Sequence, residues 1–137
     1  MRSALDIAND WHTPSDEPPH VRHADEDLRT QGRALRRAIP EVYRGFAGLR
    51  DAALAPGALD ARTKELIALA LAVAESCDGC MAAHADGAAR QGASEDEVAE
   101  ALGVTVMMGG GPAISSAPRA FAAFRDARGR READTER

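Results

Sequence analysis

The chain has 137 residues, a formal net charge of −5 and 45% hydrophobic residues, which suits one domain with a buried core. The pI of about 5.3 and the lack of a basic patch before the arginine-rich tail argue against a nucleic-acid-binding protein. No apolar run reaches the roughly 18 residues that a membrane span needs. Aromatic residues make up only 4%, and alanine is abundant, so we expect closely packed helices rather than sheets.

Residues 1–23 are polar and acidic, and they lack the apolar stretch of a secretory signal. We expect a flexible extension there, followed by one all-helical domain over residues 24–124. Two cysteines without a signal sequence indicate a reducing compartment, and we therefore expect a cytoplasmic protein.

The first predicted helices lie on either side of a proline. Residues 24–38 have a charged, helical pattern, and Pro40 interrupts them. Pro40 suits the first position of the next helix, where a backbone N–H is not needed. That helix then has one apolar face, which consists of Val42, Tyr43, Phe46 and Leu49.

A third helix is predicted over residues 61–74, with Asp60 as its N-cap. Its middle is apolar on nearly all sides, which predicts burial in the centre of a bundle. Glu65 shares a face with Leu69 and Val73, so its carboxylate points towards buried surface and needs a partner.

The segment "ESCDGCMAAH", residues 75–84, holds both cysteines. If Ser76 caps a helix, Cys77 lies in its first turn, where free N–H groups stabilise a thiolate. Spacing of three residues brings Cys80 close enough to Cys77 for a disulfide. Spacing of four places His84 beside Cys80, where its imidazole can take or give a proton.

Three interpretations of this segment compete. The cysteines could be two small core residues, as cysteine often is. They could bind zinc, although a zinc site needs further ligands, and the spare histidines lie in the extension at positions 12, 20 and 23. They could also form a redox pair, for which Gly79 would permit the tight geometry of a disulfide.

The remaining elements are also helical. Gly92 suits a helix end, and Ser94 with Glu97 forms a capping box that starts the next helix. The "GGGP" stretch, residues 109–112, should end that helix and start another. We expect residues 125–137 to be a charged tail that frays.

The chemistry-bearing residues resemble a known family. The pattern is Glu65, eleven residues, Cys77, two residues, Cys80, three residues, His84. With its flanks over residues 40–124, it resembles the AhpD-like alkylhydroperoxidases of the carboxymuconolactone decarboxylase superfamily. The resemblance implies an all-α, AhpD-like helical bundle that forms a homotrimer or a homohexamer. It also implies thiol-dependent hydroperoxide reduction, with no bound cofactor or metal.

The resemblance further implies roles for these residues. Cys80 is similar to the attacking thiolate, Cys77 to the resolving thiol, and Glu65 with His84 to the proton relay that activates Cys80. Some members have another histidine where this chain has Gly79. Members that decarboxylate a lactone lack the cysteine pair, which argues against that activity.

The electron donor implied is an external dithiol, such as a lipoyl or thioredoxin-like partner. We expect it to meet Cys77, which should be the more accessible sulfur. Two alternatives remain open: a general disulfide oxidoreductase, and a non-enzymatic redox-sensing or scaffold oligomer.

Overall fold

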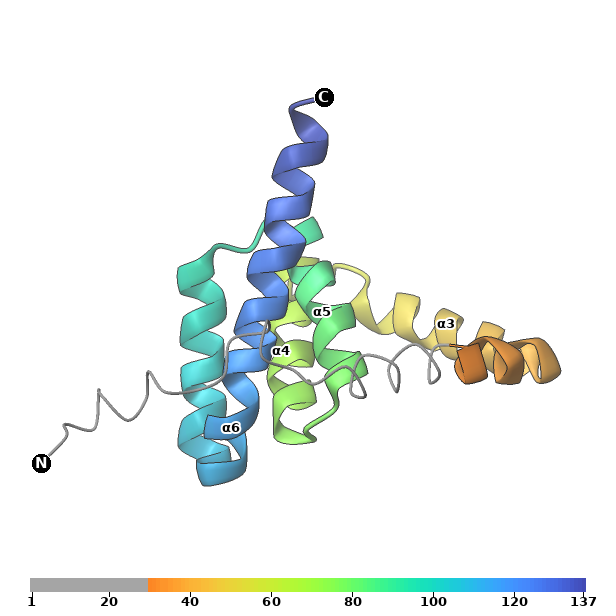
Figure 1. Ribbon diagram of the computed structural model, residues 1–137, viewed down its shortest axis with the longest axis horizontal. Helices are drawn as coiled ribbons and strands as arrows, with labels where there is room; N and C mark the ends of the chain where they lie inside the picture. Colours follow the sequence, from red (N-terminus) through yellow and green to blue (C-terminus); the bar gives the residue numbers. More distant parts are fainter. Residues whose placement is uncertain (1–29) are drawn as a thin grey trace, which may run out of the picture. The chain divides into compact units, whose positions relative to one another are not determined.

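The computed structural model describes residues 30–137, and every regular element in this range is a helix, as the sequence predicts (Figure 1). A helical stretch over residues 30–38 is followed by α3 (Pro40–Leu54), α4 (Ala61–Ala74), α5 (Asp78–Arg90) and α6 (Glu95–Thr135). The extension expected over residues 1–23 lies outside the described range. The described residues fall into two compact units, with the boundary between Leu49 and Arg50, inside α3.

Helix α3 begins at Pro40, as the sequence predicts, and it buries none of its residues. Its apolar stripe of Val42, Phe46 and Leu49 is about two-thirds exposed. A stripe of this spacing is typical of a helix that packs against another surface. In the single chain, the stripe remains in contact with solvent.

The second unit is a bundle in which α4, α5 and α6 contact one another in all three pairs. The three helices can approach closely because much of the core is alanine, whose side chain is small. The largest fully buried side chains come from all three helices: Leu69 and Val73 from α4, Met81 from α5, and Val98 and Phe124 from α6. Burial of such side chains stabilises the fold by roughly 1.5–3 kcal/mol each.

Helix α4 buries only one face, whereas its composition predicts burial on nearly all sides. Glu65, Leu69 and Val73 lie on the buried face. Ile67 and Leu71 lie on another face and are 46% and 62% exposed. The single bundle has too few helices to cover both faces.

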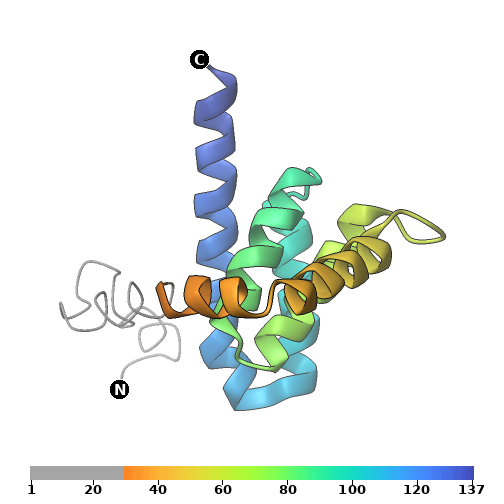
Figure 2. The ribbon, with the colours of Figure 1, turned by 90° about the vertical axis from the view of Figure 1, so that its right-hand side faces the viewer.

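Helix α6 is two helices joined at Gly110, whose φ of 61° and ψ of −139° are not helical. Glycine adopts this conformation without a steric penalty. Figures 1 and 2 show the two halves side by side and running in opposite directions. The length and composition of α6 alone would suit a membrane span. The break instead folds both halves into the bundle, as expected for the "GGGP" stretch.

The C-terminal residues correct another expectation, because α6 continues to Thr135 where we expected a frayed tail. Phe124 and Ala127 are buried on its inner face. Arg128 lies 3.2 Å from Glu95 at the start of α6 and 3.2 Å from Glu132 one turn later. These contacts support the helical conformation well into the charged segment.

Candidate active site

The turn between α4 and α5 positions the cysteines. Ser76 has a left-handed conformation with φ of 52°, which is costly for a residue with a side chain. The N–H of Ser76 donates to Val73 O at 3.1 Å, and that of Cys77 donates to Ala72 O at 3.0 Å. This pair of bonds is a Schellman motif, which ends α4.

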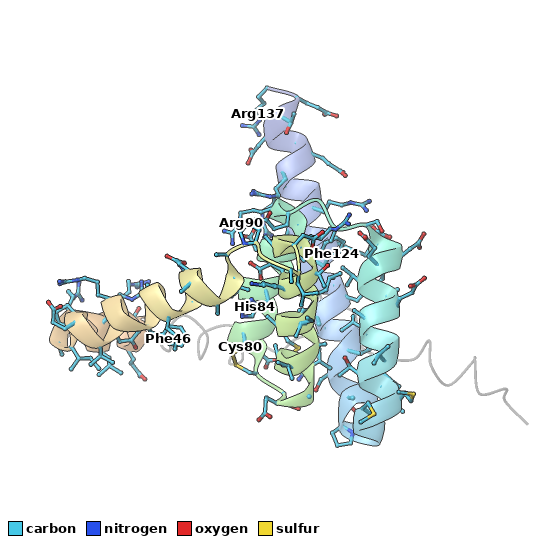
Figure 3. The ribbon with its side chains drawn as sticks, turned by 180° about the vertical axis from the view of Figure 1, so that it is seen from behind. Phe46, Cys80, His84, Arg90, Phe124 and Arg137 are labelled. Atoms are coloured by element: carbon cyan, nitrogen blue, oxygen red, sulfur yellow. A yellow bond between two sulfur atoms is a disulfide. The ribbon has the colours of Figure 1, made fainter. Side chains whose placement is uncertain are left out.

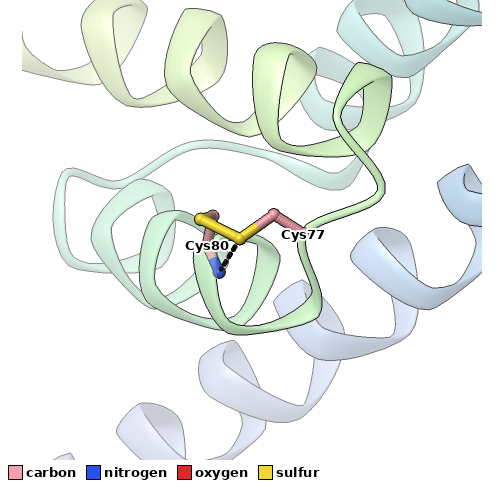
Figure 4. The surroundings of a disulfide bond; sticks show 2 residues. All are labelled: Cys77 and Cys80. Carbon is pink, nitrogen blue, oxygen red and sulfur yellow. Dashed lines mark hydrogen bonds between the residues drawn. A yellow bond between two sulfur atoms is a disulfide. The ribbon is translucent and has the colours of Figure 1, made fainter.

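Cys77 is the N-cap of α5, a position that we expected Ser76 to take. It therefore lies one residue before the first turn, and its sulfur accepts a hydrogen bond from Cys80 N at 3.3 Å (Figure 4). The N-terminal N–H groups and the helix dipole stabilise negative charge at this position. A thiolate on Cys77 would be stabilised by both.

A disulfide joins Cys77 and Cys80, whose Cα atoms are 5.2 Å apart (Figure 4). The spacing of three residues thus brings the sulfurs together, as the sequence predicts. Cys80 is exposed, whereas Cys77 is partly buried. We expected Cys77 to be the more exposed of the two cysteines. As the N-cap of α5, it instead lies against the end of α4.

Glu65 on α4 and His84 on α5 form the second half of the site. Glu65 is buried, and its Oε2 lies 2.8 Å from His84 Nδ1. The carboxylate therefore has the partner that its burial demands. An ionised carboxylate can only accept, so Nδ1 donates, and Nε2 of a neutral ring is left as a proton acceptor.

Cys80 and His84 are four residues apart within α5, so they lie on the same face one helical turn apart. Figure 3 shows the two residues one above the other along the helix. The imidazole, which contacts the buried carboxylate, thus lies one helical turn from the disulfide. An imidazole in such a position can exchange a proton with a nearby group while the carboxylate stabilises its charged form.

A cavity of about 550 Å³ lies beside the Glu65–His84 pair. Its polar lining includes Arg50, Asp86 and Arg90, and neither cysteine lines it. The pair therefore has access to solvent on a side where the disulfide is absent.

Other residues at the site are not evident from the sequence. Ser116 and Arg119 of α6 contact the cysteine turn: Ser116 Oγ lies 3.1 Å from Ser76 Oγ, and Arg119 pairs with Asp78 at 3.0 Å. Only the packing of α6 places them there. In the sequence, the one signal for Ser116 and Arg119 is that two polar residues occur close together late in an alanine-rich helix.

Two glycines near the site are also informative. Gly79 lies in α5 without a left-handed φ, and a side chain there would meet nothing within 4 Å. The disulfide therefore does not require glycine at this position. Gly87 faces the carboxylate of Glu65, a contact that we did not foresee.

A metal site would need more ligands than the described residues provide. Residues 30–137 contain no group of three or more histidine, cysteine, aspartate or glutamate side chains placed to hold an ion. The spare histidines at positions 12, 20 and 23 lie outside this range. Within it, the two sulfurs bind each other.

Comparison with known proteins identifies the family. A sequence model of the carboxymuconolactone decarboxylase family matches residues 40–125. An uncharacterised protein of Cupriavidus necator is 41% identical over 98 residues, which span 72% of this chain and 87% of that protein. An uncharacterised protein from the cox locus of Paracoccus denitrificans is 40% identical over 86 residues, or 63% of this chain and 78% of its own length.

Solved structures agree with this assignment. A carboxymuconolactone decarboxylase family protein from Legionella pneumophila superimposes with a TM-score of 0.70 and 41% identity, over 81% of this chain and 99% of that one. A family member from Thermotoga maritima, for which a role in antioxidative response has been suggested, gives a TM-score of 0.60 and 32% identity. That match covers 66% of this chain and 93% of the Thermotoga protein. The chain therefore belongs to the carboxymuconolactone decarboxylase family, in its AhpD-like superfamily.

Proposed function

We propose that the protein is a thiol-dependent hydroperoxide reductase, an alkylhydroperoxidase whose cysteine pair cycles between dithiol and disulfide. One observation carries the proposal: the Cys77–Cys80 disulfide lies one helical turn from the Glu65–His84 pair. A dithiol beside a proton relay provides both the nucleophile and the acid that cleavage of an O–O bond requires. The antioxidative role suggested for the Thermotoga relative supports the same chemistry.

The first step uses Cys80. With the pair reduced, the Cys80 thiolate attacks one oxygen of the hydroperoxide, and the O–O bond breaks. The sulfur becomes a sulfenic acid, and the leaving oxygen takes a proton from the relay to give an alcohol, or water when the substrate is hydrogen peroxide. His84, one turn away, accepts the proton of the Cys80 thiol and then donates it to the leaving oxygen, and Glu65 stabilises the imidazolium that exists between these two transfers.

The second step regenerates the disulfide. The Cys77 sulfur attacks the sulfenic sulfur, the S–O bond breaks, and water leaves. The spacing of Cys77 and Cys80 favours this reaction, because the fold already accommodates a bond between the two sulfurs. The two steps together reduce one hydroperoxide and oxidise one dithiol.

An external dithiol completes the cycle. Its thiolate attacks the exposed Cys80 sulfur, Cys77 leaves as a thiolate, and the second thiol of the donor then releases Cys80. Cys77 is the better leaving group, because the start of α5 stabilises its negative charge. This assignment replaces our expectation that the donor meets Cys77. The disulfide must be reduced again after each turnover, and the reducing conditions of the cytoplasm suit such a cycle.

A general disulfide oxidoreductase is the second candidate. The exposure of Cys80 favours it, because thiol exchange needs an accessible sulfur and no proton delivery to an oxygen. A third candidate, a non-enzymatic redox-sensing oligomer, would use the same disulfide to alter assembly.

We also propose that the protein is a homo-oligomer. The apolar stripe of α3 and the outer face of α4, with Ile67 and Leu71, are both exposed in the single chain. Exposed apolar surface on two helices is unusual in a monomer and is typical of subunit interfaces. Trimers or hexamers are the assemblies that the family resemblance implies.

Peroxide consumption by the purified protein tests the proposed function. With a small dithiol such as dihydrolipoamide, we expect catalytic consumption of an alkyl hydroperoxide. Without the dithiol, we expect a single turnover and a two-hydrogen mass loss in the peptide that holds both cysteines. A disulfide oxidoreductase would instead exchange with disulfide substrates and leave peroxide intact. Two freely alkylated thiols after peroxide treatment would rule out the peroxidase activity, and failure to exchange with disulfide substrates would rule out the oxidoreductase activity.

A further inference from the structure

Gly87 occupies a position where glycine is the poorer choice for a helix. It lies inside α5 and is buried, and its φ is not left-handed. Alanine is the more favourable residue in a helix interior, because glycine loses more backbone entropy on folding. The backbone conformation therefore gives no reason for glycine at this position.

The reason lies on the neighbouring helix. A Cβ atom at position 87 would overlap the Glu65 carboxylate, contacting its carbon and both oxygens. Among the glycines of residues 30–137, one other has an atom this close to a Cβ position: Gly109, which faces the side chain of Ala113. Gly87 thus provides the space that the carboxylate occupies between α4 and α5.

Gly87 also follows His84 by three residues, so the two lie on adjacent turns of the same helix face. Helix α5 therefore holds the carboxylate at two points. His84 Nδ1 lies 2.8 Å from one oxygen, and the Cα of Gly87 leaves room for the carboxylate against the helix. A side chain at position 87 would push the carboxylate out of this position.

We infer that Gly87 is a positioning residue for the Glu65–His84 pair, an inference that rests on the proposed function of this pair as a relay. By leaving room for the carboxylate, it maintains the bond that keeps the proton on His84 Nδ1. That bond leaves Nε2 as the nitrogen that exchanges protons with the reacting groups. Gly87 contacts neither sulfur, so it acts only through the relay.

The test compares Gly87→Ala with Gly129→Ala, which adds the same methyl group inside α6 where no atom lies within 4 Å. The first readout is the tautomer of His84, measured by ¹⁵N NMR of the ring nitrogens. We expect Gly87→Ala to lose the dominant Nδ1–H form, and Gly129→Ala to retain it. Retention of that form in Gly87→Ala would overturn the inference.

A second readout uses stability in two backgrounds, because Gly87→Ala alone could be poorly folded. In the wild-type background, we expect Gly87→Ala to lower the denaturant midpoint, since alanine and the carboxylate compete for one space. In the Glu65→Ala background, we expect the same substitution to leave the midpoint unchanged or raise it, because the space is free and alanine favours the helix. Destabilisation of equal size in both backgrounds would contradict the inference.

The third readout is the rate of peroxide reduction against pH. We expect Gly87→Ala to be at least about tenfold slower, with a pH profile that resembles that of Glu65→Gln, since a misplaced carboxylate no longer assists His84. A wild-type profile would overturn the inference. The tautomer and stability readouts need no turnover. If the protein does not reduce peroxide, the proposed function fails while these two readouts still decide the role of Gly87.

Discussion

The hydroxyl groups of Ser76 and Ser116 lie 3.1 Å apart, although forty residues separate them in the chain. Ser116 is 2% exposed and lies in the second half of α6. Arg119, one turn further, pairs with Asp78 in the first turn of α5 at 3.0 Å. The second half of α6 thus stabilises the left-handed turn that places Cys77 at the start of α5.

Two substitutions of Ser76 should separate the effect of backbone strain on stability from the effect of the hydrogen bond. We expect Ser76→Ala to destabilise the fold by about 1 kcal/mol, because it loses the bond and keeps the unfavourable φ. Ser76→Gly should remain near wild-type stability, because glycine relieves a strain of roughly 1–2 kcal/mol. Urea denaturation provides the measurement. A Ser76→Gly variant less stable than Ser76→Ala would disprove this account.

Single-cysteine variants test which sulfur attacks peroxide. After treatment with peroxide, we expect Cys77→Ser to form a sulfenic acid on Cys80 that a dimedone-type probe traps, but not to turn over. Cys80→Ser should not be labelled at a comparable rate, because Cys77 is partly buried and is not the cysteine one turn from His84. Samples without peroxide give the background. Rapid labelling of Cys77 together with an inert Cys80 would show that the roles are reversed.

Removal of the relay should slow the reaction without unfolding the protein. We expect Glu65→Gln and His84→Ala to lower the rate of peroxide reduction at neutral pH by roughly 10²–10⁴-fold, the usual contribution of general acid–base catalysis. Glu100→Gln, which alters an exposed carboxyl group on α6, is the matched control. Wild-type rates for both relay variants across the pH range would show that these residues are structural.

Asp60, the N-cap of α4, should make the stability of the fold depend on pH in the acidic range. Hydrogen bonds from the side chain and backbone of Thr63 hold the pKa of Asp60 below its usual value of 3.8. Because the folded pKa is the lower one, this stabilisation is present above the unfolded pKa and is lost as pH falls through the folded value. We therefore expect the stability difference between wild type and Asp60→Asn to shrink below about pH 4. Denaturation midpoints at several pH values measure it, and a constant difference would contradict the assignment.

Assembly can be measured by light scattering. We expect a homo-oligomer, and a stable monomer near 14.5 kDa would refute the proposal. Phe46→Glu places a charge in the exposed stripe of α3 and should shift the protein towards smaller species. Arg44→Glu, on the opposite side of α3, is the control and should leave the assembly intact.

The helix starts could be predicted because they depend on nearby residues. Asp60 accepts from Thr63 N at 2.7 Å, and Ser94 and Glu97 form both bonds of the capping box. The burial of Glu65 also follows from helical periodicity, since it shares a face with Leu69. In these cases, the sequence within one or two turns contains the deciding interaction.

The remaining features depend on residues distant in sequence. The left-handed Ser76 is unexpected, because glycine is the usual residue at that position and a serine of α6 supports it here. The need for Gly87 appears only when α4 lies against α5. The exposed face of α4 reflects how few helices one chain provides. Local patterns cannot indicate which surfaces of the bundle remain uncovered.

Cys77 has a structural role as an N-cap that does not require its thiol to be redox-active. Serine, threonine, aspartate or asparagine would cap α5 at least as well as cysteine does. Replacement of Cys77 by one of these residues would remove the dithiol and keep the bundle. Evolution could therefore lose or regain redox chemistry on this scaffold through a single codon, and residue 77 is the position at which to look for that divergence among relatives.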